Sequence, residues 1–175
     1  MAQVRQALDL VLARAMPYPA LVVDRRWDLV RANAGLGLLL DGVAPELLVP
    51  PVNVLRVSLH PDGLQSHREE FGRYSAHVLA VLRRQAVVLG DAELVELHAE
   101  LADLPGEETS GAHEPGGVVL PLRVRKPLGL LSFFTTAGRF GTAADVTLAE
   151  LTVEPFFPAD ASTAAAVEEW GAVQP

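Results

Sequence analysis

Residues 17–40 constrain the fold of this chain more than any other stretch, because they place a tight hairpin directly before a helix. A short apolar run is followed by a charged turn and then by residues 27–32, whose character alternates. Two such runs joined by a polar turn predict a β-hairpin. Within the second run, Trp27, Leu29 and Arg31 are expected on one face of the strand and the residues between them on the other.

The residues after the hairpin predict the start of a helix. Asn33 stands where an N-cap belongs, because its side-chain oxygen can accept a hydrogen bond from an amide of the first turn. Gly35 and Gly37 suggest a dinucleotide-binding loop, but Leu40 occupies the third glycine position and no acidic residue follows where a ribose would need one. We interpret the glycines as small residues that let the helix lie close to the sheet.

The composition indicates one globular domain. The chain has 175 residues, of which 50% are hydrophobic and 21% are charged, and this suits a single well-buried core. The formal net charge of −8 is unfavourable for contact with a phosphate backbone, so we expect no nucleic-acid binding by this chain alone. Without cysteine there are no disulfides and no thiolate metal sites, which is compatible with a reducing cytoplasm.

The N-terminal residues predict a helix and no targeting segment. Apolar residues recur at helical spacing through residues 2–16, and Pro17 ends the pattern. Charged residues interrupt any signal-peptide core, and no apolar run approaches the roughly 20 residues of a membrane span. We therefore expect a cytoplasmic protein with no membrane contact, consisting of a lead-in helix over 1–16, one domain over 17–170 and a tail over 171–175.

The middle of the chain predicts a turn and a long helix. The sequence His-Pro-Asp-Gly over 60–63 is typical of a type I turn. An amphipathic helix is expected over 67–89, with Phe71 and Tyr74 in its apolar stripe and Arg68 on its hydrated side.

Two further helices are predicted from their caps. Asp91 is expected to cap a helix over 92–104, and Asp160 or Ser162 a last short helix. Glycine, proline and acidic residues over 105–117 predict a surface loop between the helices and the strands that follow.

Alternating apolar residues over 120–125, 130–137 and 147–154 predict three late strands. Pro121 cannot donate a hydrogen bond to a neighbouring strand, so the first of these should lie at a sheet edge. We therefore expect an α+β fold with an antiparallel sheet of about five strands, with 120–125 at one edge, 27–32 at the other, and helices packed on one face. This order of elements is that of a PAS-like domain.

Motifs for catalysis, metal binding or cofactor binding are missing from the sequence. The five histidines lack metal-ligand spacing, and there is neither a nucleophile elbow nor a phosphate-binding loop. The adjacent acidic pairs at Glu69-Glu70 and Glu107-Glu108 do not form an acid–base dyad. We therefore expect no enzymatic activity, no metal and no cofactor.

Several spaced segments in a fixed order carry a resemblance that covers most of the chain. They are 59–64 (LHPDGL), 118–122 (VVLPL), 140–142 (FGT), 145–151 (DVTLAEL), Glu154, 156–160 (FFPAD) and Thr163. From about Val4 to Trp170 the chain resembles the ligand-binding domain of MmyB-like transcription regulators. This PAS-like module follows a helix-turn-helix head in regulators of the XRE type.

Two features depart from the family pattern. Glu70-Phe71 stands where the family usually carries an Asn-Trp pair at the start of the long helix. No helix-turn-helix sequence precedes the lead-in helix, so we expect either an excised sensor domain or a natural relative without the head.

The resemblance implies a domain that senses a small apolar ligand, of a fatty-acid-like class, for a bacterial transcription regulator. It also implies that DNA is contacted only through a helix-turn-helix head, and such heads favour a homodimer because they read two half-sites. The expected site is an apolar cavity between the sheet and the long helix. Its predicted walls are Leu21, Val23, Leu29, Phe71, Tyr74, Val78, Leu131 and Phe133.

Arg56 is the predicted anchor for a carboxylate head group, with Tyr74 and His77 behind it, because a guanidinium can hold both oxygens at once. A solvated Arg56 is the alternative. Two other classes of function stay open. A solid core with an exposed apolar patch would indicate a PAS-like dimerisation module without a ligand, and a pocket holding titratable groups with displaced pKa values would indicate an enzyme.

Overall fold

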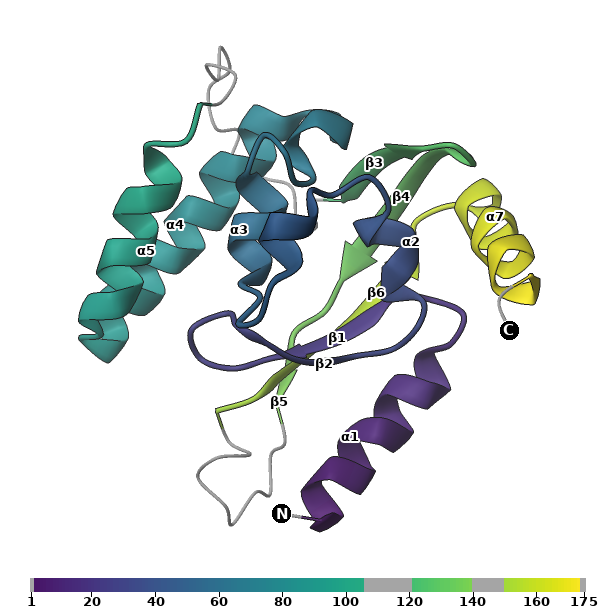
Figure 1. The fold of residues 1–175 in the computed structure, drawn as a ribbon, viewed down its shortest axis with the longest axis horizontal. Helices are drawn as coiled ribbons and strands as arrows, with labels where there is room; N and C mark the ends of the chain where they lie inside the picture. Colours follow the sequence, from purple (N-terminus) through teal and green to yellow (C-terminus); the bar gives the residue numbers. More distant parts are fainter. Residues whose placement is uncertain (1, 106–120, 140–149, 174–175) are drawn as a thin grey trace.

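The computed structural model describes residues 2–105, 121–139 and 150–173. Its helices and strands occur in separate groups along the chain and form an α+β fold (Figure 1). The helices are α1 (Ala2–Ala15), α2 (Leu36–Leu40), α3 (Val54–Leu59), α4 (Phe71–Leu89), α5 (Ala92–Ala102) and α7 (Ala161–Ala172), with 3-10 turns η1 (Pro45–Leu48) and η2 (Gln65–His67). The strands are β1 (Ala20–Val23), β2 (Leu29–Ala32), β3 (Leu122–Lys126), β4 (Gly129–Thr135), β5 (Gly138–Arg139) and β6 (Thr152–Pro158).

The sheet confirms the predicted fold class and both predicted edges. Its order is β2-β1-β6-β4-β3, all pairs are antiparallel, and the short strand β5 pairs with β6 beside this path. β2 therefore lies at one edge and β3 at the other. Pro121, which cannot donate a hydrogen bond to a neighbouring strand, directly precedes the edge strand β3.

The hairpin forms as predicted, but the predicted orientation of its second strand is wrong. Val22 pairs with Arg31 and Val23 pairs with Leu29, so a bulge separates the two pairs. The extra residue turns Leu29 and Arg31 to opposite faces of the sheet. Trp27 lies before the strand, in the left-handed region with φ 68, and this conformation further breaks the expected alternation.

Asn33 does not cap a helix, contrary to the sequence prediction. α2 begins at Leu36, and no side chain bonds to its first turn. The Asn33 side chain instead accepts a hydrogen bond from the Ala20 amide (3.0 Å) and donates to the carbonyl oxygens of Leu12 (3.1 Å) and Tyr18 (2.9 Å). One amide side chain thus joins the end of α1, the start of β1 and the turn before α2.

The long helix α4 is shorter than predicted, because the chain before it turns twice. Residues Gln65–His67 form η2, and Glu70 adopts the left-handed region with φ 54 at the helix N-terminus. Arg68 therefore lies outside the helix, and its predicted place on the hydrated side of a helix is wrong. Gly90, with φ 61, ends α4 in the left-handed conformation that glycine adopts readily.

Three other local predictions are confirmed by hydrogen bonds. The Gly63 amide donates to the His60 carbonyl (2.9 Å), as a type I turn requires. Asp91 caps α5, and of the two candidates for the last helix Asp160 is the cap. The predicted loop over 105–117 lies almost entirely outside the described residues.

The last strand extends beyond its predicted end at Glu154. β6 continues to Pro158 and includes two prolines. On the side away from β1, β6 pairs with β5 up to Val153 and with β4 from Phe156 onward, so Pro155 falls between the two ladders. The missing N–H of this proline therefore interrupts neither ladder. Residues 147–149, with which the predicted strand begins, lie outside the described part of the chain.

The two faces of β1 belong to two separate cores. Leu21 and Val23 pack with α2, α7 and the inner residues of the late strands. On the opposite face, Ala20 and Val22 pack against Leu8 and its neighbours in α1. Most helices therefore cover one face as predicted, while α1 lies across the other (Figure 1). In the described part of the chain no helix is both long and apolar enough to span a membrane.

We predict that Asn33→Ala lowers the free energy of unfolding by about 2–3 kcal/mol, because it leaves three part-buried backbone groups without their partner. Urea titration followed by circular dichroism measures this loss. Asn33→Asp keeps the acceptor for Ala20 but turns a charge toward two carbonyl oxygens, so it should be at least as destabilising. An aspartate variant as stable as the wild type would contradict the assignment.

Candidate functional site

The structure sorts the predicted pocket walls into two apolar clusters. Five of them belong to a sheet cluster, which the inner face of the sheet forms with α2 and α7: Leu21, Val23, Leu29, Leu131 and Phe133. Three belong to a helix cluster, which α3, α4 and α5 form: Phe71, Tyr74 and Val78. The predicted walls are thus divided between the sheet and the helical layer, and we call the boundary between these two clusters the seam.

Trp27 is the main bridge across this seam, and the sequence prediction did not assign it to the site. Its ring packs against both the sheet cluster and the helix cluster, as does Val54. Its indole Nε1–H donates to Gln85 Oε1 of α4 (2.9 Å), and Gln85 Nε2 donates to the Arg25 carbonyl of the hairpin (2.9 Å). The side of α4 that carries Gln85 is therefore fixed to the hairpin.

A hollow of about 210 Å³ lies within the helical layer. Its lining is mostly apolar and comes from α3, α4, α5 and the residues after α5: Leu59, Phe71, Ser75, Leu79, Leu101, Ala102, Leu104 and Pro105. Phe71 is the residue that this hollow shares with the predicted walls. The volume is smaller than the roughly 300–1,000 Å³ of sites that enclose drug-sized ligands.

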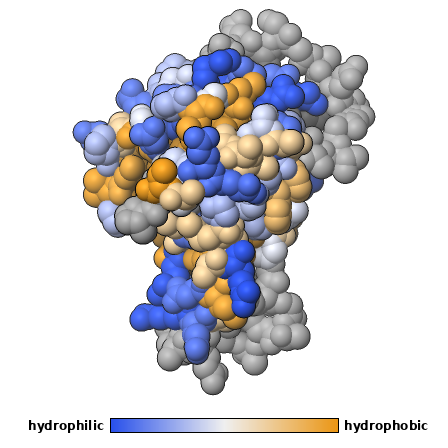
Figure 2. Space-filling view, turned by 90° about the vertical axis from the view of Figure 1, so that its right-hand side faces the viewer, coloured by the Kyte–Doolittle hydropathy of each residue, from blue (hydrophilic) through white to orange (hydrophobic). Residues whose placement is uncertain are grey.

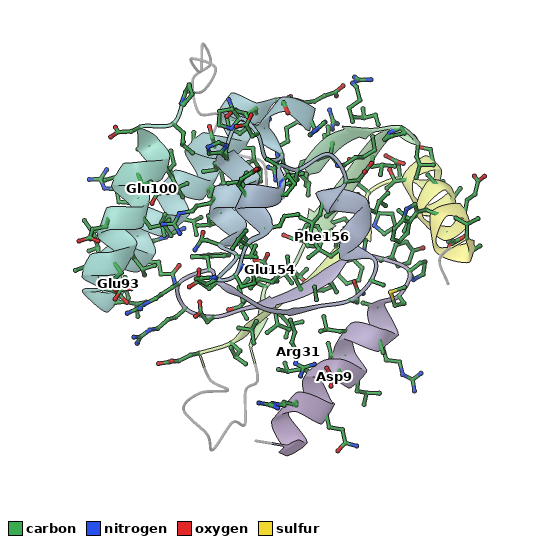
Figure 3. The ribbon with its side chains drawn as sticks, viewed as in Figure 1. Asp9, Arg31, Glu93, Glu100, Glu154 and Phe156 are labelled. Carbon is green, nitrogen blue, oxygen red and sulfur yellow. The ribbon has the colours of Figure 1, made fainter. Side chains whose placement is uncertain are left out.

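Arg56 lies on α3 and is bonded to α5. Its Nε and Nη2 atoms donate to the two carboxylate oxygens of Glu100, both at 2.7 Å. This bidentate pair lowers the pKa of Glu100 and is partly exposed to solvent; Figure 3 shows Glu100 among the side chains of α5. His77, the other predicted mouth residue, is exposed on α4. The structure therefore pairs Arg56 with a carboxylate of the protein itself.

Arg68 is half-buried, although the sequence pattern assigned it to a hydrated surface. It precedes α4 and forms an isolated bridge with Val124 of the edge strand β3. The carbon at the centre of its guanidinium lies 3.4 Å from the centre of the Tyr74 ring. Its Nε and Nη1 atoms are closed to solvent and have no hydrogen-bond partner. Desolvation lowers the pKa of Arg68 below its usual value.

Lys126 shows how a buried cation of this fold is satisfied. Its ammonium lies under the end of α2 and donates to the carbonyl oxygens of Leu39 (2.8 Å) and Asp41 (2.5 Å). These are C-terminal carbonyls, which carry partial negative charge. Lys126 therefore has a structural partner on the protein, in contrast to Arg68.

Glu154 lies on the inner face of the sheet. The sequence alternation had placed it on the polar side of its strand. It pairs with Leu21 of β1, and the next inner residue on β6 is the buried Phe156 (Figure 3). Burial in these apolar surroundings raises the pKa of Glu154 to about 7. A second ionisable group thus lies on the face that the sheet turns toward the helices.

The described side chains show no arrangement for metal binding, since no three His, Asp or Glu residues among them come together. The two ionisable groups described above, Arg68 and Glu154, form no hydrogen bond or ion pair with each other.

Comparison with known proteins gives one result of note. The family model described as the MmyB-like transcription regulator ligand binding domain matches residues 4–169. A search of curated proteins found no match. The matched region begins in α1, ends in α7 and includes every buried residue of the two clusters.

We predict that Glu154→Gln stabilises the protein at pH 8 and leaves it nearly unchanged at pH 4. A pKa raised from 4.5 to about 7 means that the folded state disfavours the charged carboxylate. The wild type therefore loses stability as the pH rises from about 4.5 through about 7. After discounting for partial exposure, the variant should gain about 1–3 kcal/mol at pH 8.

Urea titrations at pH 4 and pH 8 measure this difference. Glu46→Gln, at an exposed position on η1, gives the effect of removing one surface carboxylate. Equal gains at both pH values for Glu154→Gln would contradict the assigned burial of the charge.

Proposed function

The chain belongs to the MmyB-like transcription regulator ligand binding domain family, and we propose that it senses a small apolar ligand of the fatty-acid class. The observation that supports this best is the pair of apolar clusters on the sheet and in the helical layer, together with the hollow that Phe71 lines inside the helical layer. The proposal assigns the domain no catalytic activity.

The proposed binding region is the seam between the sheet and α4. Its sheet side carries Leu21, Val23, Leu29, Leu131 and Phe133, and its α4 side Phe71, Tyr74 and Val78. A hollow of about 210 Å³ is too small for a long acyl chain, so the ligand needs a wider space than the one described. We expect α4 to move away from the sheet on binding, with Trp27 as the contact that changes.

Burial of the ligand's tail supplies most of the proposed affinity. A chain of about twelve methylenes contributes roughly 10 kcal/mol of transfer free energy, at about 0.8 kcal/mol each. Association itself costs on the order of 4–15 kcal/mol, so apolar burial alone gives micromolar binding at best. A polar anchor then decides which head group is accepted. At Arg56, the anchor predicted with His77, a ligand carboxylate would have to replace Glu100.

The wider role of the domain follows from its charge and family. With a net charge of −8 it is unsuited to DNA, so we propose that it acts on DNA only through a helix-turn-helix head of the XRE type, in the cytoplasm of a bacterium. The ligand would change the state of the head through α1, which packs directly on the outer face of β1.

We predict saturable, micromolar binding of dodecanoic acid to the purified chain, measured by calorimetry after any co-purifying lipid has been extracted and identified by mass spectrometry. Phe71→Trp should weaken binding about tenfold or more, because a larger ring at this 5% exposed position fills the hollow. Val88→Trp, at a 76% exposed position of the same helix, is the control and should bind like the wild type.

Circular dichroism establishes that both tryptophan variants are folded. If the wild type binds neither dodecanoic acid nor a co-purifying molecule, the sensing function fails, and a PAS-like dimerisation module with a filled core becomes the better reading.

We also predict a homodimer at tens of micromolar, with α1 in the contact. Leu10 and Val11 of α1 are 59% and 41% exposed, and Figure 2 shows apolar side chains among charged ones on the molecular face that it displays. Light scattering measures the mass of the particle, and Leu10→Glu should reduce it toward that of one chain. A wild-type monomer at this concentration would contradict the proposal that this chain forms the dimer.

A further inference from the structure

Arg68 differs from the two other cations whose contacts are described above, the buried Lys126 and the exposed Arg56. Lys126 donates to two carbonyl oxygens and Arg56 to a carboxylate. Arg68 is desolvated more completely than Arg56, yet two of its guanidinium nitrogens have no acceptor. Only the face of the Tyr74 ring compensates its charge among the contacts described. A desolvated charge without a partner is costly, so its presence requires an explanation.

The position of Arg68 places this charge at the seam. Backbone contacts fix the segment to the edge strand, since Arg68 bridges to Val124 and the Glu69 amide donates to the Arg123 carbonyl (3.2 Å). Val124 is fully buried in the sheet cluster. On the other side, Tyr74 under the guanidinium belongs to the helix cluster. Arg68 thus lies where β3 meets the start of α4.

The side of α4 that carries Tyr74 faces the turn of the hairpin. Tyr74 and Val78 are four residues apart and Gln85 is seven further on, so the three share one side of the helix. Gln85 on this side bonds to Trp27 and to the hairpin backbone. The guanidinium that stacks on Tyr74 therefore lies at the same interlayer seam that we propose for the ligand.

We propose that Arg68, in place of Arg56, holds the carboxylate head group of the proposed ligand. This inference rests on the proposed sensing function and adds the residue that selects an acid over a neutral lipid with the same tail. A carboxylate can accept hydrogen bonds from two guanidinium nitrogens at once, and it supplies the counter-charge that the described contacts do not provide. The tail then extends between Tyr74 and the inner face of the sheet.

The Nε and Nη1 atoms of Arg68 are closed to solvent, so the head group reaches both of them only when β3 and the start of α4 move apart. This couples recognition of the acid to an opening of the seam. The proposal also implies a cost for the unoccupied protein, because an apolar residue of similar length at position 68 would bury no charge. Arg68→Met should therefore be folded and at least as resistant to urea as the wild type.

The test compares dodecanoic acid with 1-dodecanol, which has the same tail and no charge, at pH 8. The wild type should bind the acid about 10- to 100-fold more tightly than the alcohol, the range expected for hydrogen bonds to a charged group. Arg68→Met should lose this preference and still bind the alcohol. Arg31→Met, which removes a half-exposed guanidinium paired with Asp9 of α1, is the matched control and should keep the preference. Arg56→Met tests the anchor predicted from the sequence and should also keep the preference.

Each outcome separates the anchor from the sensing function. If the wild type binds acid and alcohol equally well, the sensing function stands and the assignment of Arg68 is overturned. It is also overturned if Arg68→Met keeps the preference for the acid, or if Arg56→Met alone loses it. Binding of neither probe by the wild type removes the sensing function for this ligand class, and the anchor with it.

Arg68→Lys provides a second variant whose charge is retained. It keeps one cation but cannot hold both carboxylate oxygens in the planar geometry of a guanidinium, so the preference for the acid should fall to an intermediate value. Trp27, which contacts both clusters, serves as a fluorescent reporter of the opening in a Trp170→Phe background. Its emission should change with the acid in the wild type and not in Arg68→Met.

Discussion

The fold depends on burying β1 on both faces. All four of its residues are buried. Leu21 and Val23 point into the sheet cluster, whereas Ala20 and Val22 pack against α1 on the opposite face. Because side chains of a strand alternate, one backbone carries residues of both cores. Under the proposed function, a ligand that displaced the inner residues of β1 would also displace the surface on which α1 packs. The bonds of Asn33 tie α1 to the start of this strand.

Features set by local chemistry could be predicted from the sequence. Pro121 indicated the edge strand because a missing N–H has the same consequence in any sheet, and Asp91 and Asp160 cap their helices through amides only two or three residues away. Asn33 had the same local signal as a cap, but its three partners lie up to 21 residues away. No short-range pattern distinguishes these two uses of an asparagine.

The candidate site was predicted less well, because it depends on which elements meet. The apolar walls were recognisable from their periodicity, whereas Arg68 and Glu154 looked like ordinary surface charges. Arg68 is withdrawn from solvent because Glu70 turns the chain before α4. Glu154 is withdrawn because its position in β6 pairs with Leu21 and so points to the inner face of the sheet. Trp27, a large side chain within a charged turn, was the available signal that the hairpin contacts a second layer.

The two buried charges cannot neutralise each other, and the register of the sheet shows why. Leu122 pairs with Phe133 and Phe133 with Pro158, so Val124 beside Arg68 lies six positions along the strands from Glu154. At about 3.3 Å per residue this is about 20 Å, before the two intervening strand spacings of about 4.8 Å are added. Each charge therefore faces its own end of the seam. A carboxylate held at the Arg68 end would leave its apolar tail to run toward Glu154, whose raised pKa keeps that end closer to neutral.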